Sequence, residues 1–191
     1  TDVVVGKVAR LFELKGHEFV IRCAPHVIQQ CPEVRFLFVG DGQLRTDFEQ
    51  QIAQLGLTKH FIFAGLVPPD DVPKYIGAMD MLVHTSLREG LARALPQALL
   101  AGKPAISYDI DGAREVVRSN ETGFLIPPLE IDSLAAAIVK LARDSQLRDR
   151  LGRAGQGFCK PRFDHRLMTH RIRDVYTQTL GRNLSQADQL N

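Results

Sequence analysis

The sequence lacks the features that mark membrane, secreted or nucleic-acid-binding proteins. No part of its 191 residues approaches the roughly 18 consecutive apolar residues that cross a bilayer, and no basic segment with an apolar core opens the chain. Lys and Arg number 24 against 22 Asp and Glu, so the net charge of +2 provides no basic footprint for nucleic acid. We therefore expect a soluble, cytoplasmic protein that binds no nucleic acid.

Residues that could form a disulfide framework or a metal site are also scarce. Cys23, Cys31 and Cys159 are odd in number and include no C-x-x-C pair, so neither a disulfide framework nor a zinc knuckle is indicated. The six histidines are scattered, and His165 and His170 lie five residues apart, which is not a spacing of metal ligands. We expect reduced thiols, no bound metal and no cofactor.

Short apolar runs recur along the chain between longer amphipathic stretches. This rhythm is typical of repeated βα units, and runs without alternation indicate strands of a parallel sheet that is covered on both faces. The predicted strands are residues 3–8, 36–39, 61–64, 81–84, 105–107 and 123–126. The predicted fold class is α/β, with a Rossmann-like, doubly wound parallel sheet of about six strands.

Helical patterns fill the intervals between the predicted strands. Apolar residues recur at helical spacing over residues 44–55 and over residues 131–142, where Asp132 is a candidate N-terminal cap. Pro25 lies inside a third pattern, residues 17–30, where it should remove a hydrogen bond and kink the helix.

The strand pattern stops after residue 143, and two polar helices are predicted at residues 146–156 and 165–180. Eight Lys or Arg stand against four Asp between residues 144 and 174. We expect a solvated helical surface there, with a peripheral membrane contact or a partner contact as the alternative. Residues 181–191 are expected to form a disordered tail.

The loops that follow the first two strands carry candidate binding residues, because open parallel sheets bind ligands at the carboxyl ends of their strands. Arg10 and Lys15 could present two cations to an anion such as a diphosphate, although two solvated cations are the alternative. Gly40, next to Asp41 and Gly42, permits a tight turn close to a ligand. The chain has neither G-x-G-x-x-G nor a Walker lysine loop, which argues against a nicotinamide enzyme and a P-loop nucleotidase.

The loop after residues 81–84 carries the most specific pattern. Residues 85–104 resemble the P-S-x-x-E-G-F-G-x-x-x-x-E-A-x-A-x-G-x-P signature of family 4, or group 1, glycosyltransferases. Residues 10–16 resemble the family's R-x-x-x-x-K-G, residues 39–42 its V-G-D-G, and residues 111–117 its G-G-x-x-E-I-V. The resemblance covers about residues 3–180, in matching order and spacing.

The resemblance implies a domain organisation and an activity. Members of the family have the GT-B fold of two Rossmann-like domains, and this chain resembles the second one, which binds the donor. Residues 1–180 are thus expected to form a nucleotide-sugar-binding domain, with the N-terminal acceptor-binding domain absent from the chain. The expected enzyme is a retaining, metal-independent glycosyltransferase that uses a UDP or GDP sugar and an unknown acceptor. The chain alone is expected to be inactive.

The resemblance also assigns roles to residues. Glu89 matches the acid that lies against the donor sugar and is the candidate catalytic residue. Arg10 and Lys15 would stabilise the charge on the leaving diphosphate, and backbone N–H groups around residues 90–92, at the start of the next helix, would donate to phosphate or sugar oxygens. The complete set of expected donor-binding residues is Arg10, Lys15, Gly40, Gly65, Val67, Glu89, Gly90, Leu91, Ala92, Arg93 and Gln97.

Several positions depart from the family pattern. Gln97 replaces the second acid, which holds the ribose, so it keeps a hydrogen-bonding amide but loses a charge-assisted bond. Ala92 replaces a glycine, and Asp111 with Arg114 replaces a glycine and a proline. These departures leave open a non-catalytic nucleotide-binding or regulatory module on the same fold. A sugar-nucleotide epimerase or a phosphorylase is a second alternative.

His84 ends a predicted strand close to Glu89 in the sequence. We expect it to be a satisfied histidine at a sheet edge, with a contact to the donor as the alternative. The sequence does not identify the base, the sugar, the acceptor or the oligomeric state.

Overall fold

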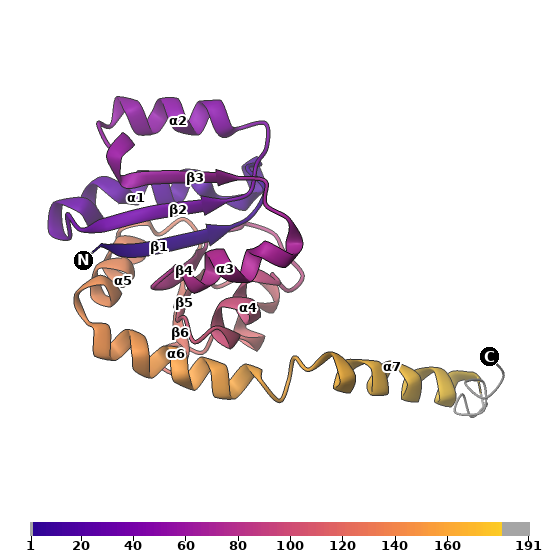
Figure 1. Ribbon diagram of the computed structural model, residues 1–191. Coiled ribbons are helices and arrows are strands. Elements are labelled where there is room, and N and C mark those ends of the chain that lie inside the picture. Colours follow the sequence, from indigo (N-terminus) through magenta and orange to yellow (C-terminus); the bar gives the residue numbers. More distant parts are fainter. Residues whose placement is uncertain (1, 181–191) are drawn as a thin grey trace.

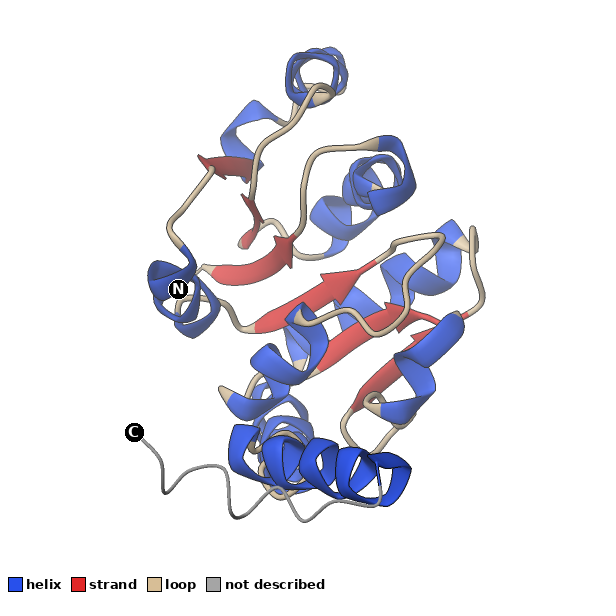
Figure 2. Ribbon diagram, turned by 90° about the vertical axis from the view of Figure 1, so that its right-hand side faces the viewer, coloured by secondary structure: helices blue, strands red, loops and turns tan. Residues whose placement is uncertain are grey.

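In the computed structural model, which describes residues 2–180, six parallel strands form one twisted sheet with helices on both faces (Figure 1, Figure 2). The order of the strands in the sheet is β3-β2-β1-β4-β5-β6. The strands are β1 Val3–Val8, β2 Val34–Val39, β3 Phe61–Gly65, β4 Met81–His84, β5 Ala105–Tyr108 and β6 Gly123–Ile126. The predicted fold class is confirmed, and each predicted strand is present within two residues of its expected bounds.

Seven α-helices and four short 3-10 helices connect the strands within the described part of the chain. Helices α1, α2 and α5 cover one face of the sheet, while α3, α4 and the end of α6 cover the other. The α-helices are α1 His17–Gln30, α2 Arg45–Gln54, α3 Val72–Gly77, α4 Ala94–Leu100, α5 Ile131–Arg143, α6 Ser145–Cys159 and α7 His165–Leu180. The 3-10 helices are η1 Glu13–Lys15, η2 Thr58–His60, η3 Pro69–Asp71 and η4 Asp111–Glu115.

The two faces of the sheet explain why the strands are apolar without alternation. In β2, Phe36 and Phe38 pack into the core beneath α1, α2 and α5, whereas Leu37 and Val39 pack beneath α3 and α4. Successive side chains of a strand point to opposite faces, so a strand that is buried on both faces needs apolar residues at every position.

One detail of the helices differs from the sequence expectations. Helix α5 begins at Ile131, so Asp132 lies in its first turn and is not its N-terminal cap. The carboxylate that caps a helix nearby is Asp144, which accepts the backbone N–H of Leu147 at 2.8 Å at the start of α6. Helix α1 has the predicted bounds and continues through the exposed Pro25, while Cys23, Ala24 and Val27 are buried.

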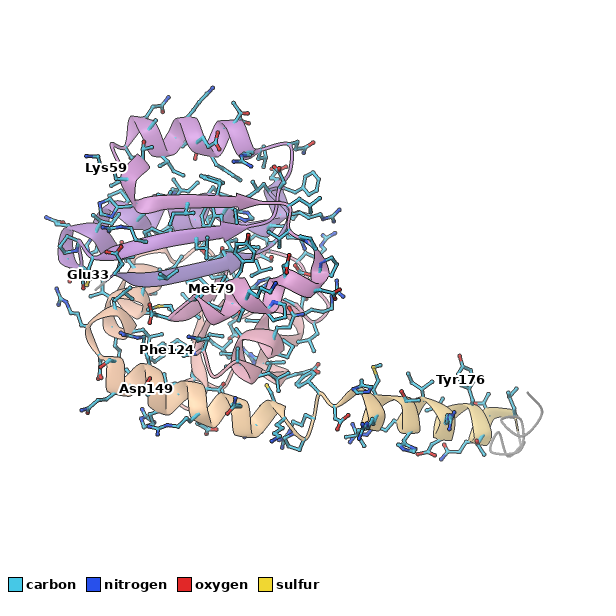
Figure 3. All side chains as sticks on the ribbon, in the orientation of Figure 1. Glu33, Lys59, Met79, Phe124, Asp149 and Tyr176 are labelled. Carbon is cyan, nitrogen blue, oxygen red and sulfur yellow. The ribbon has the colours of Figure 1, made fainter. Side chains whose placement is uncertain are left out.

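Helix α7 extends away from the rest of the molecule (Figure 1). None of its residues is buried, and Figure 3 shows the side chain of Tyr176 with no other element beside it. The two predicted polar helices are thus present, as α6 and α7. The predicted tail, residues 181–191, lies outside the described residues.

The three cysteines are free, as expected, and the structure shows that all three are buried. Burial raises the pKa of Cys23 to about 12 and that of Cys159 to about 11, so both remain thiols at neutral pH. Among residues 2–180, no helix has both the length and the apolar character needed to traverse a bilayer.

Candidate functional site

The strand order reverses between β1 and β4, which makes the carboxyl ends of these strands the topological switch point of the sheet. The loops that follow them are joined by hydrogen bonds: Leu87 N–H donates to the Leu14 carbonyl at 2.9 Å, and the Thr85 hydroxyl donates to the Gly16 carbonyl at 2.6 Å. Gly16 has φ 66°, and a Cβ there would lie 2.0 Å from the Thr85 carbonyl oxygen. Only glycine allows the two loops to approach this closely.

A cavity of about 420 Å³ opens at this switch point. Nine of the predicted donor-binding residues line it: Arg10, Lys15, Gly40, Val67, Glu89, Leu91, Ala92, Arg93 and Gln97. Gly65 and Gly90 were predicted for the site but are not among the lining residues. The cavity also contains residues that the sequence did not single out, namely Val8, Ala9, Val39, Leu66, Pro69, Val72 and Ala94.

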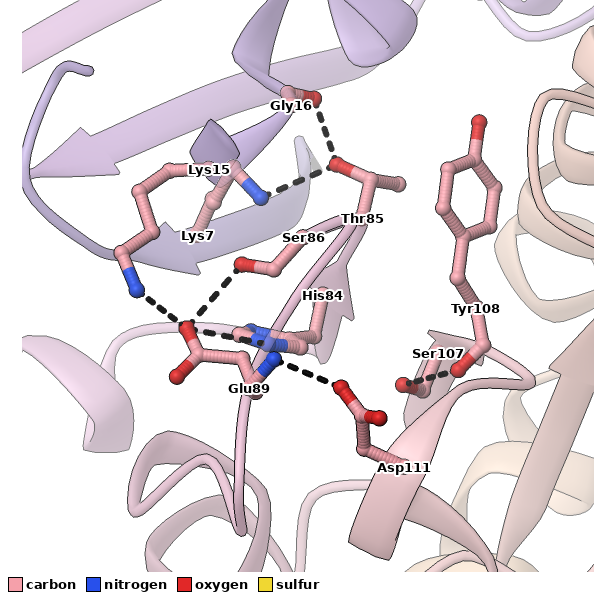
Figure 4. Close-up of polar contacts among 10 residues, drawn as sticks. All are labelled: Lys7, Lys15, Gly16, His84, Thr85, Ser86, Glu89, Ser107, Tyr108 and Asp111. Atoms are coloured by element: carbon pink, nitrogen blue, oxygen red, sulfur yellow. Dashed lines mark hydrogen bonds and ion pairs between the residues drawn. The ribbon is translucent and has the colours of Figure 1, made fainter. Parts of the chain in front are cut away.

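The carboxylate of Glu89 lies among three side chains that carry hydrogen-bonding groups, Lys15, Ser86 and His84 (Figure 4). Its Oε1 forms an ion pair with Lys15 Nζ and accepts a 3.2 Å hydrogen bond from the Ser86 hydroxyl. The His84 Nε2 lies 3.9 Å from the same oxygen. Because Lys15 and Glu89 keep only about a fifth of their side-chain surface exposed, at 21% and 22%, solvent screens this pair only in part.

Arg10 is placed differently from Lys15. Its guanidinium stacks 4.9 Å from the centroid of the Phe12 ring and forms no ion pair with any residue of the described range 2–180. The two cations therefore both face the cavity, but only Lys15 is neutralised by a protein carboxylate.

Two hydrogen bonds join the backbone of the Glu89 loop to the loop that follows β5. Glu89 N–H donates to the Asp111 carboxylate at 2.7 Å, and Gly112 N–H donates to the Gly90 carbonyl at 3.0 Å. Asp111 has φ 43°, a conformation that costs a non-glycine residue on the order of 1 kcal/mol. The side chain that replaces the family's glycine thus supports the Glu89 loop.

Four consecutive backbone amides, those of residues 90–93, donate to no acceptor within the described chain. Helix α4 begins at Ala94, so Gly90, Leu91 and Ala92 lie in the loop before the helix and not at its start as expected. Gln97 lies in the first turn of α4, exposed and at the cavity. Unpaired N–H groups next to a helix N-terminus are suited to binding anionic or hydroxyl oxygens.

The structure contradicts both parts of the expectation for His84, that it lies at a sheet edge and that its hydrogen bonds are satisfied. Strand β4 lies between β1 and β5, so His84 ends an interior strand and not an edge strand. Its Nε2 is buried without a hydrogen-bond partner in the described structure. Burial, with smaller contributions from the charges of Lys7 and Lys15, lowers the pKa of His84 to about 3, so the ring is neutral at neutral pH.

Lys7 is a buried base beneath the site that the sequence reading missed. It is 1% exposed, and its Nζ donates to the Thr85 hydroxyl at 2.9 Å. Burial lowers the pKa of Lys7 to about 7, while the nearby Glu18 acts in the opposite direction. A lysine inside an otherwise apolar strand was the signal that could have revealed it.

Asp109 and Asp111 are two carboxylates at D-x-D spacing that were not predicted as metal ligands from the sequence. Asp109 accepts two hydrogen bonds from Arg114, at 2.5 and 2.6 Å, which hold the pKa of its carboxyl below the usual range. Asp111 is bonded to the Glu89 amide. Within residues 2–180, no three His, Cys, Asp or Glu side chains are grouped so that they could hold a metal ion.

Comparison with known proteins identifies the family. The family model for glycosyl transferases group 1 matches residues 1–158. The chain belongs to the group 1 glycosyltransferases. Its loops after β1 and β4 thus carry the family's motifs at the switch point, and the resemblance seen in the sequence is confirmed.

Curated relatives of this group 1 domain act on different acceptors. It is 31% identical over 141 residues to 2-deoxystreptamine glucosyltransferase of Streptomyces kanamyceticus, an alignment that covers 74% of the chain and 36% of the relative. It is 32% identical over 166 residues to phosphatidyl-myo-inositol mannosyltransferase of Mycobacterium leprae, covering 85% and 42%. The chain thus spans less than half the length of these relatives.

Solved structures agree on the fold. Anabaena Alr3699/HepE in complex with UDP-glucose has a TM-score of 0.83 and 31% identity, with 93% of this group 1 domain and 49% of that chain aligned. The C-terminal domain of the group 1 protein LpcC from Francisella tularensis has a TM-score of 0.79 and 23% identity, covering 85% and 86%. The second likeness supports the fold alone, and it matches a domain of nearly the same extent.

Proposed function

We propose that this chain is the donor-binding domain of a retaining glycosyltransferase that transfers a hexosyl group from a nucleoside-diphosphate sugar. One observation carries the proposal: two cations, a carboxylate and three residues with unpaired backbone amides, Leu91, Ala92 and Arg93, line one cavity at the switch point. The cavity volume of about 420 Å³ lies in the range of small-molecule sites. The UDP-glucose complex of the 31% identical Alr3699/HepE supports a UDP sugar as the donor.

Arg10, Lys15 and the amides of residues 90–93 bind the diphosphate in this proposal. Negative charge accumulates on the leaving nucleoside diphosphate as its bond to the sugar breaks, and fixed cations and N–H dipoles stabilise that charge. Because these groups can neutralise the diphosphate, the transferase needs no divalent metal. Gly40 and Val67 line the same cavity and would contact the nucleotide.

Glu89 faces the sugar in this proposal and is the candidate catalytic residue. A carboxylate beside the anomeric carbon would orient the sugar hydroxyls and stabilise the positive charge that develops there. Gln97, in the first turn of α4, would hydrogen-bond the ribose through a neutral amide.

The complete enzyme is proposed to include an N-terminal acceptor-binding domain, since the curated relatives are more than twice as long as the matched region. The exposed apolar residues of α7 would pack against that domain. They are Met168, Ile172, Val175, Tyr176 and Leu180. Without that domain we expect no sugar transfer by this chain. We propose that the complete enzyme is cytoplasmic. As the alternative, the basic surface of α6 and α7 would bring it into peripheral contact with a membrane.

Calorimetric titration of the chain with UDP and UDP-glucose tests the donor site. Arg10→Ala should weaken both ligands by roughly 2 kcal/mol, because a cation is lost from a partly dehydrated diphosphate site. Arg22→Ala removes a similar charge from the exposed side of α1 and should change neither affinity. Equal loss in both variants, or no loss in either, would refute the assignment.

A non-catalytic nucleotide-binding module is the second candidate, favoured by Gln97 in place of the family's acid. Such a module needs no contact with the sugar. It should therefore bind UDP and UDP-glucose equally. The transferase domain should bind UDP-glucose more tightly than UDP, because Glu89 contacts the sugar, and Glu89→Gln should remove this preference.

A further inference from the structure

The ammonium of Lys15 has two competing partners in the proposed donor site, the Glu89 carboxylate and the diphosphate. In the structure its ammonium pairs with Glu89 Oε1, and the same ammonium lines the cavity where a diphosphate would bind. A diphosphate carries more charge than one carboxylate, so its binding draws Lys15 toward the phosphate oxygens. The Glu89 carboxylate then loses its only ion-pair partner of fixed charge among the described residues.

The groups that remain around Glu89 Oε1 are Ser86 and His84. The Ser86 hydroxyl already donates to it, at the long distance of 3.2 Å. The His84 Nε2 is 3.9 Å away, too far for a hydrogen bond, and it has no other partner within residues 2–180. A buried ring nitrogen without a partner is rare in folded proteins and calls for an explanation.

We infer that His84 is a positioning residue that binds the Glu89 carboxylate when Lys15 leaves it to bind the diphosphate. The His84 Nε2–H then donates to Glu89 Oε1, and Oε2 is left for the donor sugar. This exchange, called here the handover, rests on the proposed donor site and adds to it a residue with a defined partner.

The backbone geometry fits the handover. His84 ends the interior strand β4, where its backbone is in register with Ser107 of β5, and its side chain is buried. The Glu89 backbone is anchored by Asp111. A rotation of the Glu89 side chain alone can therefore shorten the 3.9 Å separation to the ~2.9 Å of a hydrogen bond.

The charges around His84 favour a neutral imidazole ring as the hydrogen-bond donor. Lys7 and Lys15 are the cations that act on the ring, and Glu89 is the carboxylate that faces its Nε2. A neutral imidazole can donate from Nε2 without cancelling the charge of Glu89. Replacement of a charged partner by a neutral one leaves more negative potential at the sugar, where positive charge develops during transfer.

Two matched variants test the handover, with UDP and UDP-glucose as the probes. In His84→Gln the side-chain amide nitrogen reaches the place of Nε2, whereas in His84→Asn it reaches the place of Nδ1. We expect His84→Gln to bind UDP within about twofold of wild type, whereas His84→Asn should bind UDP more weakly than that, because the hydrogen bond to Glu89 that forms when Lys15 leaves is lost. The preference for UDP-glucose should fall about tenfold in His84→Asn and be largely kept in His84→Gln.

The outcomes separate the handover from the proposed function. If Arg10→Ala weakens UDP but both His84 variants keep the preference for UDP-glucose, the handover is wrong and the donor site stands. If the two His84 variants lose the preference equally, the position of the donated hydrogen is irrelevant and the handover is also wrong. If UDP does not bind at all, both proposals fall.

A measurement on the wild-type chain avoids the risk that a variant fails to fold. With ¹⁵N-labelled histidine, saturation with UDP should shift the Nε2 resonance of His84 and slow the exchange of its proton, because a new hydrogen bond forms. An unchanged His84 ring at saturating UDP would overturn the handover.

Discussion

The ammonium of Lys7 donates to the hydroxyl of Thr85 at 2.9 Å, and that hydroxyl donates in turn to the Gly16 carbonyl at 2.6 Å (Figure 4). The buried side chain of Thr85, which directly follows β4, thus joins Lys7 near the end of β1 to the end of the loop that carries Lys15. The alignment of Lys15 with Glu89 depends on this chain of hydrogen bonds, because Gly16 directly follows Lys15.

The first prediction concerns the Lys7–Thr85 hydrogen bond. Thr85→Val keeps the shape of the side chain but leaves the buried ammonium of Lys7 without its hydrogen-bond partner, which should cost roughly 1–3 kcal/mol. Urea unfolding measures this loss. Lys7→Met removes the ammonium, so the double variant should lose less stability than the sum of the two single changes. Additive losses would show that the two side chains are not coupled.

The second prediction is a pH dependence of stability that arises from two buried histidines. Burial lowers the pKa of His17 to about 2 and that of His84 to about 3. The folded pKa values lie below the unfolded value of about 6.5, so the unfolded chain binds more protons once the pH falls below that value. Stability should therefore fall from pH 6.5 to 4.5, by up to about 1.4 kcal/mol per pH unit for each histidine.

His17→Phe provides the matched control for that slope. The His17 ring lies against Phe38 and Phe48, at centroid distances of 5.0 and 5.6 Å, and both of its nitrogens lack partners in the described structure. A phenyl ring should keep this packing and remove one titrating group. The slope between pH 6.5 and 4.5 should drop by about 1.4 kcal/mol per pH unit, and an unchanged slope would contradict the assignment.

The third prediction restores the acid that the family has at position 97. Gln97→Glu should strengthen UDP binding by about 1 kcal/mol, because a carboxylate makes charge-assisted bonds to ribose hydroxyls. Gln54→Glu, on the exposed face of α2, adds the same charge away from the cavity and should have no effect. Calorimetry measures both variants, and a gain in both would indicate a general charge effect.

The fourth prediction is that nucleotide binding needs no divalent metal, because in the proposed site Arg10, Lys15 and the loop amides would neutralise the diphosphate. Addition of a chelator should leave the affinity for UDP unchanged. A loss of more than about tenfold, or ~1.4 kcal/mol, would instead implicate the carboxylates of Asp109 and Asp111 as metal ligands.

The fifth prediction separates the two roles of Asp111. Asp111→Gly loses the bond to the Glu89 amide but relieves the backbone at φ 43°, whereas Asp111→Ala loses the bond and keeps the strain. Thermal unfolding should therefore show Asp111→Ala to be less stable than Asp111→Gly by about 1 kcal/mol. Both should bind UDP-glucose less well than wild type, and equal stability would argue against strain at this residue.

Much of the architecture and most of the candidate site followed from local patterns in the sequence. Strands buried on both faces are apolar at every position, as in β2, so their limits are visible without the fold. The loop motifs depend on residue types at short spacing, such as Glu89 beside Gly90, and these are read directly from the chain.

Only the tertiary structure decided which of these residues meet. Lys15 and Glu89 are separated by 74 positions and pair because β1 and β4 lie side by side, an order of strands that no local pattern encodes. The same order makes β4 an interior strand, which buries His84 and leaves its Nε2 without a partner. Local pattern is set by which side chains can be buried, whereas contacts between distant loops are set by how the strands pair.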